Sequence, residues 1–100
     1  MAREHYASGN WLVRAGAEAD FIERWRDWIG ASTKNISGFV SATLMHDLTN
    51  DRHFVSFSEW NDPNSRDAWK TSPEFAKGFA GCRELCEDFQ GGDHEAVVSF

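Results

Sequence analysis

Two polar side chains in apolar surroundings, Asn10 and His46, are the residues of this sequence whose types could do chemistry. Asparagine is disfavoured inside a strand, so Asn10 needs a hydrogen-bond partner if the strand buries it. That partner is either a backbone group or the carbonyl or phenolate oxygen of a ligand. His46 carries an imidazole that titrates near neutral pH and is a candidate general base, although a strand end equally suits a solvated histidine.

The sequence lacks the common motifs of metal and nucleotide sites. No two of the four histidines have a spacing such as HxH or HxxxH, so we expect no metal centre. Cys82 and Cys86 lie four residues apart, which predicts two free thiols beside a helix core. No GxGxxG, P-loop or GxSxG motif occurs, so dinucleotide, nucleotide and serine-hydrolase sites lack support.

Composition and charge restrict the partners of the chain. A formal net charge of −6 over 100 residues argues against nucleic acid and anionic membranes, because both are bound by clustered Lys and Arg. No apolar run is long enough to span a bilayer, and the first residues lack a signal-peptide pattern. We therefore expect a single domain, residues 1–100, in the cytoplasm. Five Trp and eight Phe suit a small core or a lined cavity.

The apolar patterns of the sequence predict the strands and helices that position Asn10 and His46. Alternating residues predict three strands, over residues 5–15, 38–48 and 53–60. An apolar stripe at helical spacing predicts a helix over residues 18–33. It consists of Phe21, Trp25, Trp28 and Ile29.

The second half of the chain shows two helix starts. Asp62-Pro63 and Ser72-Pro73 each combine an N-cap residue with proline at the first helical position. They predict a short helix over residues 63–70 and another helix from residue 73, which carries Cys82 and Cys86 and ends at Gly91-Gly92. A last strand is expected over residues 94–100.

This order of elements predicts an α+β fold of the ferredoxin-like, split β-α-β type with an antiparallel sheet. Helices would cover one face of the sheet. The other face would still carry large residues such as Trp11 or Phe57, which need a cover. A second copy of the sheet is the simplest cover, so we expect a homodimer.

Three blocks of the sequence resemble the antibiotic biosynthesis monooxygenase family of dimeric α+β barrel proteins. The first is Phe21-Ile22-Glu23-Arg24-Trp25, and the second is the pair Gly38-Phe39. The third and most specific block holds Trp60 and Trp69, with eight residues between them. The resemblance extends over nearly the whole chain.

The resemblance implies several activities, because some members oxidise aromatic polyketides with O2 and no cofactor, whereas others degrade haem or act on small signalling molecules. In the oxygenases, an Asn on the first strand and a Trp on the short helix line the pocket, and Asn10 and Trp69 match them here. Haem-degrading members carry a histidine ligand about ten residues after that Trp. Phe79 occupies this position and cannot bind iron, so the resemblance disfavours haem.

The resulting hypothesis is a cofactor-independent monooxygenase that acts on a small, flat aromatic or quinol-like molecule of the polyketide type with O2. His46 or a water would take the proton, Asn10 would hold the oxyanion, and Trp69 would position the ring. The residues expected to bind the substrate beside them are Tyr6, Ser8, Phe75 and Phe79. A non-catalytic dimer that binds a small apolar ligand, a haem protein and an isomerase remain alternatives.

Overall fold

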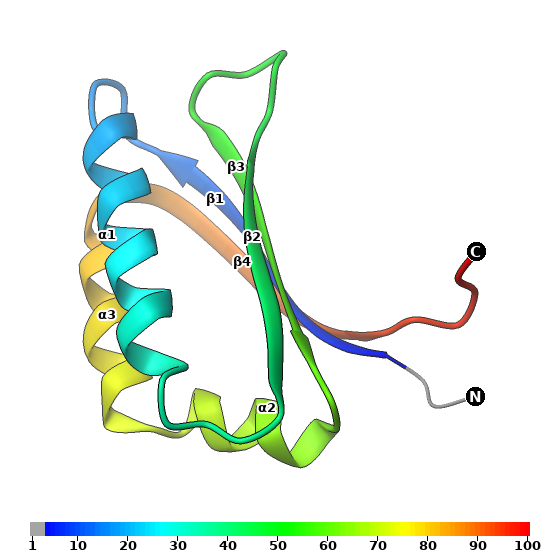
Figure 1. Ribbon diagram of the computed structural model, residues 1–100. Coiled ribbons are helices and arrows are strands. Elements are labelled where there is room, and N and C mark those ends of the chain that lie inside the picture. The colour runs from blue at the N-terminus through cyan, green and yellow to red at the C-terminus, as the bar shows by residue number, and fades with distance from the viewer. Residues whose placement is uncertain (1–3) are drawn as a thin grey trace.

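Within residues 4–100, which the computed structural model describes, helices and strands form two layers, with the helices on one face of a sheet (Figure 1). The strands are β1 (His5–Val13), β2 (Phe39–His46), β3 (His53–Trp60) and β4 (Cys86–Glu95). The helices are α1 (Glu18–Ser32), α2 (Pro63–Lys70) and α3 (Pro73–Glu84). No helix in this part of the chain is both long and apolar enough to cross a membrane.

The strands lie in the order β2-β3-β1-β4, and every neighbouring pair is antiparallel. This order places β1 between β3 and β4, as two interleaved β-α-β units require. The predicted α+β, ferredoxin-like fold is therefore confirmed. The predicted bounds of β3 and α2 also agree with the structure, and those of β1, α1 and β2 differ by at most two residues at either end.

Both predicted helix starts are capped as their sequences indicate. The Asp62 carboxylate accepts a hydrogen bond of 2.8 Å from Ser65 N, and this bond lowers the pKa of Asp62. The Ser72 hydroxyl accepts one of 3.2 Å from Phe75 N. Each cap satisfies a backbone N–H that the helix itself leaves without a partner. The caps thereby set where α2 and α3 begin.

The short helix α2 packs directly on the backbone in front of β2. Gly38 has a φ of +93°, which favours glycine, and a Cβ built there would lie 2.3 Å from Ser65 Oγ. The Asn61 N–H donates a 2.8 Å bond to the Gly38 carbonyl. The glycine of the Gly38-Phe39 pair is therefore needed to seat α2, which carries Trp69 into the space between sheet and helices.

The predicted end of the chain is wrong in two respects. Helix α3 ends at Glu84 rather than at Gly91-Gly92, and the last strand begins at Cys86 rather than at residue 94. Because β4 pairs with β1 from His5↔Glu95 to Val13↔Cys86, a full-length ladder replaces the longer helix.

The glycines of the sheet mark close packing instead of a helix end. Gly9 lies opposite Gly91 in the β1–β4 ladder. A Cβ on Gly9 would lie 2.7 Å from Trp11 Nε1, and one on Gly91 would lie 2.9 Å from Phe89 Cζ. Two aromatic side chains thus cover a strip of bare backbone, which is a recognised role of glycine in strands.

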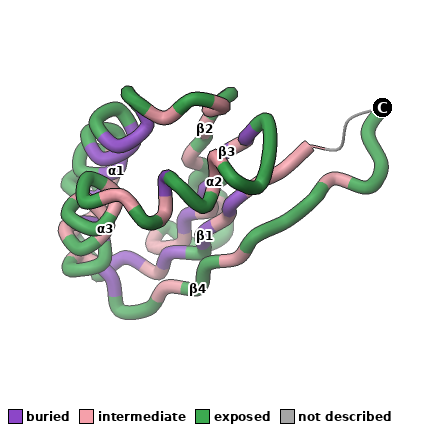
Figure 2. Tube along the Cα trace, turned by 90° about the horizontal axis from the view of Figure 1, so that it is seen from below, coloured by how far each residue is buried: buried purple, intermediate pink, exposed green. Residues whose placement is uncertain are grey.

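The buried faces of the strands determine which side chains meet the helices. On β1 the buried residues are Ala7, Gly9, Trp11 and Val13, whereas Asn10 is exposed. The expectation that Trp11 lies on the outer face and Asn10 under the helices is therefore wrong. Burying an indole removes far more apolar surface from water than burying an amide, which decides the face. Figure 2 shows the buried segments gathered where α1 and the sheet face each other.

The outer face of the sheet, which the helices leave uncovered, keeps apolar residues as expected. Phe57 on β3 is 36% exposed, and Met45 on β2 is 45% exposed. The chain beyond β4 extends away from the body (Figure 1) and exposes Val97 and Val98.

Candidate functional site

A cavity of about 170 Å³, called the aromatic cavity below, lies between the buried face of the sheet and the helices. Its lining is dominated by aromatic rings from every layer of the fold. The sheet contributes Trp11 and Phe89, α1 contributes Trp25 and Trp28, α2 contributes Trp69, and α3 contributes Phe75 and Phe79. A cavity between sheet and helices with such a lining is a candidate site for an apolar small molecule.

The rings of the lining hold one another in place. Trp28 stacks on Trp69 at 5.7 Å with an interplanar angle of 24°, and Phe75 stacks on Phe79 at 5.7 Å with an angle of 5°. Trp69 meets Phe75 edge to face at 4.6 Å. Parallel and edge-on contacts of this kind are the favoured geometries of aromatic pairs, so the lining offers further ring faces to a flat ligand.

Two serines of β3 place hydroxyl groups in this apolar surrounding. Ser56 Oγ accepts a 2.9 Å hydrogen bond from Trp11 Nε1, and Ser58 Oγ accepts one of 2.9 Å from Trp60 Nε1. Both serines are buried and line the aromatic cavity. A hydroxyl that accepts from an indole still carries its own hydrogen, which can be donated to a ligand oxygen.

The sequence interpretation missed these serines, although a signal for them exists. Ser56 and Ser58 lie between Phe54 and Trp60 on the buried face of β3, so two polar residues stand at core positions. Serine in such a place must satisfy a polar neighbour or serve a site.

Two indole N–H groups of the lining have no hydrogen-bond partner. Trp25 Nε1 and Trp28 Nε1 are buried and unbonded, whereas Trp69 Nε1 donates to Ser32 Oγ at 2.9 Å. A buried donor without an acceptor costs about 1–3 kcal/mol. Both nitrogens are sealed off by the side chains packed around them, so they carry this cost without offering a donor to the cavity.

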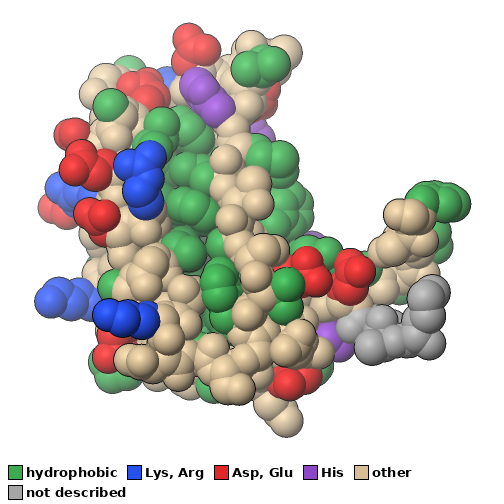
Figure 3. Space-filling view, in the orientation of Figure 1, with side chains coloured by type: hydrophobic (Ala, Val, Ile, Leu, Met, Phe, Trp, Pro, Cys, Tyr) green, Lys and Arg blue, Asp and Glu red, His purple; other side chains and the backbone are tan. Residues whose placement is uncertain are grey.

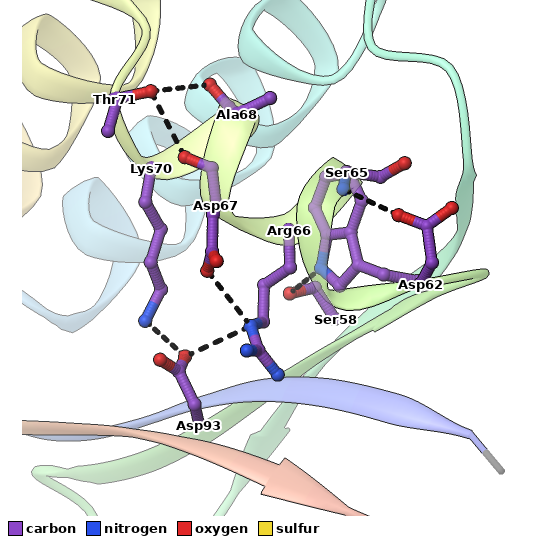
Figure 4. Close-up of polar contacts among 10 residues, drawn as sticks. Ser58, Asp62, Ser65, Arg66, Asp67, Ala68, Lys70, Thr71 and Asp93 are labelled. Carbon is purple, nitrogen blue, oxygen red and sulfur yellow. Dashed lines mark hydrogen bonds and ion pairs between the residues drawn. The ribbon is translucent and has the colours of Figure 1, made fainter.

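Lys70 is the only charged residue among the described residues that line the aromatic cavity. Its ammonium group is bonded to the Asp93 carboxylate, which joins α2 to β4 (Figure 4). Arg66 of α2 lies beside this pair, with Nε 3.5 Å from Asp93 Oδ1 and 3.5 Å from Asp67 Oδ1. Because Lys70 and Asp93 are both partly exposed, they mark the solvent side of the cavity.

Four of the residues named from the sequence border the aromatic cavity in the structure, namely Trp69, Phe75, Phe79 and Ser8. Asn10 is not among them, because its Oδ1 lies 3.1 Å from His53 Nε2 on the outer face. The expectation that Asn10 and Trp69 share a pocket is therefore wrong.

The hydroxyl groups of Tyr6 and Ser8 lie on the outer face of β1 with Asn10. The Tyr6 hydroxyl donates to Glu4 at 2.8 Å, and this bond and burial raise its pKa to about 12. Ser8 borders the aromatic cavity beside Gly9, but its hydroxyl lies 3.1 Å from His94 Nδ1. Neither hydroxyl is available to the cavity.

His46 borders a different space, a groove of about 270 Å³ between α1 and the β2–β3 edge. Its ring stacks on Phe54 at 4.4 Å, and Nε2 lies 2.7 Å from the Asp51 carbonyl oxygen. Figure 3 shows apolar side chains in a hollow between α1 and β2. Trp25 borders both spaces and separates His46 from Trp69, so the expectation that His46 acts beside Trp69 is wrong.

The remaining polar clusters do not form a metal site. His53 Nδ1 lies 2.8 Å from Asp47 Oδ2, and this hydrogen bond, with others from Thr49, holds the pKa of Asp47 well below its usual range. Within residues 4–100, no group of three or more His, Cys, Asp or Glu could hold a metal ion.

The two cysteines are free and buried, as expected, but only Cys82 lies on a helix. Cys86 opens β4 and its Sγ donates to the Cys82 carbonyl at 3.4 Å. Burial raises the pKa of Cys82 to about 12 and raises that of Cys86 as well. A thiol held protonated is a poor nucleophile, so neither cysteine is a catalytic candidate.

Comparisons with known proteins agree with this geometry. Residues 6–81 match the family model described as antibiotic biosynthesis monooxygenase. A search of curated proteins finds no match. Among solved structures, a variant of SnoaB, a cofactor-independent oxygenase from Streptomyces nogalater, has a TM-score of 0.86 at 23% identity and covers 96% of this chain and 95% of that chain.

Two further structures have the same fold. A conserved protein from Methanosarcina mazei has a TM-score of 0.82 at 17% identity, covering 93% of this chain and 92% of its own. Protein SO0527 from Shewanella oneidensis has a TM-score of 0.84 at 16% identity, covering 99% and 96%. At these identities the likenesses establish the fold.

Proposed function

Since the chain belongs to the antibiotic biosynthesis monooxygenase family, we propose that it is a monooxygenase that oxidises a small aromatic molecule with O2 and needs no cofactor. The observation that carries the proposal is the aromatic cavity, whose walls are ring faces and whose lining includes the buried Ser56 and Ser58 hydroxyls. An electron-rich aromatic ring with an oxygen substituent would stack against these walls and offer an acceptor to these hydroxyls.

The chemistry follows from the substrate rather than from a bound group. A phenol or quinol-like ring that loses a proton becomes an anion that can pass electrons to O2. Where the ring carries an activated methylene, the CH2 becomes C=O with one atom of O2, and the other oxygen leaves as water with both hydrogens. The methylene supplies all four electrons that O2 takes up, so flavin and metal are not required.

The protein would stabilise the anion and keep it from water. The Ser56 hydroxyl lies beside Gly9, since a Cβ built on Gly9 would be 2.8 Å from Ser56 Oγ. This hydroxyl can donate a hydrogen bond to the phenolate oxygen. The aromatic walls, Trp69 among them, hold the ring flat and exclude solvent. Ser56 thereby takes the oxyanion role that the sequence interpretation had given to Asn10, and Trp69 keeps the positioning role.

The proton has no acceptor inside the cavity, because the described lining contains no His, Asp or Glu. We therefore infer that it leaves to solvent at the mouth. The pH dependence of kcat/KM should then follow the pKa of the substrate's own phenol, and a series of phenols with different pKa values would test this. A midpoint that stays constant across the series would instead indicate a protein base.

Oxygen uptake by the purified protein with quinol-type and methylene-activated phenols tests the activity itself. We expect one labelled oxygen atom in the product when the gas is 18O2. Ser56→Ala should lower kcat by about 10²-fold, as loss of an oxyanion donor does elsewhere. Asn10→Ala, on the opposite face of β1, is the matched control and should keep wild-type rates. No uptake above the uncatalysed rate with any compound that binds would refute the proposal.

A non-catalytic protein that binds a small apolar ligand is the second candidate, and the lack of a titratable base in the described lining favours it. It predicts the same ligands with saturable binding and no oxygen uptake. A haem role finds no support in this cavity, because Phe79 lies at the matching position and no histidine is among the described lining residues.

We also infer that the protein acts as a homodimer. The outer face exposes Phe57 and Met45, and a sheet face with such residues is rarely left open to water. A second copy on this face would bury these side chains. Light scattering on the purified protein measures the mass directly.

A further inference from the structure

The charged groups at the mouth of the aromatic cavity indicate which aromatic molecules it accepts. Lys70 lines the cavity and places its ammonium group at the solvent side, where Asp93 of β4 is its partner (Figure 4). The lysine lies between an apolar interior and water. A ligand that fills the interior and carries an anionic group at its outer end would meet this ammonium directly.

Arg66 adds a second cation whose hydrogen-bonding capacity is not met. Its side chain is only 13% exposed, and its Nε lies 3.5 Å from Asp93 Oδ1 without forming a hydrogen bond. Lys70 contacts this same Asp93 oxygen. Arg66 Nε also lies 3.5 Å from Asp67 Oδ1, so the guanidinium stands beside the cavity lining between two carboxylates without a hydrogen bond from Nε. Arginine prefers two parallel bonds to one carboxylate, and neither of these contacts supplies that geometry.

The size of the cavity limits the aromatic part of the ligand. An apolar cavity of about 150 Å³ holds one benzene molecule, whereas pockets for larger ligands measure about 300–1,000 Å³. At about 170 Å³, the aromatic cavity encloses one ring, and a second ring would extend toward the mouth. A substituent on that outer part lies at the level of Lys70.

Resting on the proposed function, we propose that the substrate is an aromatic acid of one or two rings, whose carboxylate replaces Asp93 as the partner of Lys70 and Arg66. In the free protein Asp93 occupies the position of this carboxylate and holds β4 to α2. The net charge of −6 repels anions in general, whereas these two cations attract them at the mouth of the cavity. An aromatic acid would therefore be favoured over other anions, because its ring fills the cavity while its carboxylate reaches the cations.

Binding of a stable ligand pair tests the proposal without any turnover. 2-Naphthoate and 2-naphthamide differ in charge and hardly in shape, and the tryptophans of the lining report binding by fluorescence. We expect wild-type protein to bind the naphthoate about tenfold tighter than the amide. Lys70→Met should abolish this preference, whereas Asp93→Asn should tighten naphthoate binding and leave the amide unchanged. Lys77→Met, an exposed lysine of α3 outside the lining, is the control and should behave as wild type.

Equal affinity for the two compounds in wild-type protein, or a preference that survives Lys70→Met, would overturn the inference. The two proposals also fail separately. A protein that prefers the acid but consumes no O2 with any phenol retains this inference and loses the oxygenase. One that oxidises neutral quinols and shows no preference for acids retains the oxygenase and loses this inference.

Discussion

Gly78 of α3 packs closely against Trp28 of α1, and Gly78→Ala is therefore a sharp test of the structure. A Cβ built on Gly78 would lie 2.1 Å from Trp28 Cδ1 and 2.6 Å from Trp28 Cγ. Ordinary carbon–carbon contact is about 3.5 Å, so the methyl group is about 1.4 Å too close. Trp28 cannot turn aside, because it already contacts the rings of Trp11, Trp69 and Phe79.

The net effect is the difference between two opposing contributions. Replacing glycine by alanine inside a helix stabilises it by about 1 kcal/mol. Overpacking a filled core costs about 1–3 kcal/mol, and a deficit this large belongs at the upper end of that range. We expect Gly78→Ala to lower the free energy of unfolding by about 2 kcal/mol, which is a fall in Tm of about 8–16 °C for a domain of this size.

Gly81 provides the matched control on the same helix. A Cβ there would have no neighbour within 4 Å, so Gly81→Ala should raise stability by about 0.5–1 kcal/mol through helix propensity alone. Urea unfolding followed by circular dichroism, at one protein concentration for all variants, measures both changes. If Gly78→Ala were as stable as Gly81→Ala, α3 would not pack on Trp28 as described, and the wall of the aromatic cavity would need to be redrawn.

Three further predictions follow from buried or paired groups. Cys82 and Cys86 should resist iodoacetamide at pH 8 until the protein unfolds, and mass spectrometry can follow the alkylation. Burial raises the Cys82 pKa from 9.0 to about 12, so the free energy of unfolding should decline as the pH rises above 9. Early alkylation under native conditions would contradict this. The hydrogen bond from His53 lowers the Asp47 pKa, so the stability due to this carboxylate is present above its usual pKa of 3.8 and is lost only as the pH falls below it. An NMR titration of His53→Gln should show the Asp47 pKa moving upward, and no movement would exclude the assigned cause. Phe57→Asp on the outer face should keep the fold and yield monomers in light scattering, whereas the wild-type protein should be a dimer. A wild-type protein that is itself monomeric would contradict this prediction.

Several elements were predictable because their signals are local. Asp62-Pro63 and Ser72-Pro73 act within one turn of the helices that they start, so both starts agree with the structure. The last helix and strand were not predictable in this way. Gly91-Gly92 reads locally as a helix end, but pairing with β1 along its whole length places both glycines in β4.

Of the site residues predicted from the sequence, some line the aromatic cavity and others lie elsewhere. Trp69, Phe75 and Phe79 were identified from the sequence and do line the aromatic cavity. Asn10 was predicted from the family resemblance and His46 from the ordinary pKa of an imidazole, yet Asn10 lies on the outer face and His46 at a separate groove.

The sequence by itself determined the order of the elements, the starts of α2 and α3, and the supply of aromatic side chains, because each of these depends on neighbours along the chain. Only the tertiary structure decided which face of β1 is buried. Alternation offers two equivalent faces, and the choice depends on the apolar area that Trp11 brings against α1 and α3. That choice also decided that Ser56 and Lys70, rather than Asn10, supply the polar groups of the cavity.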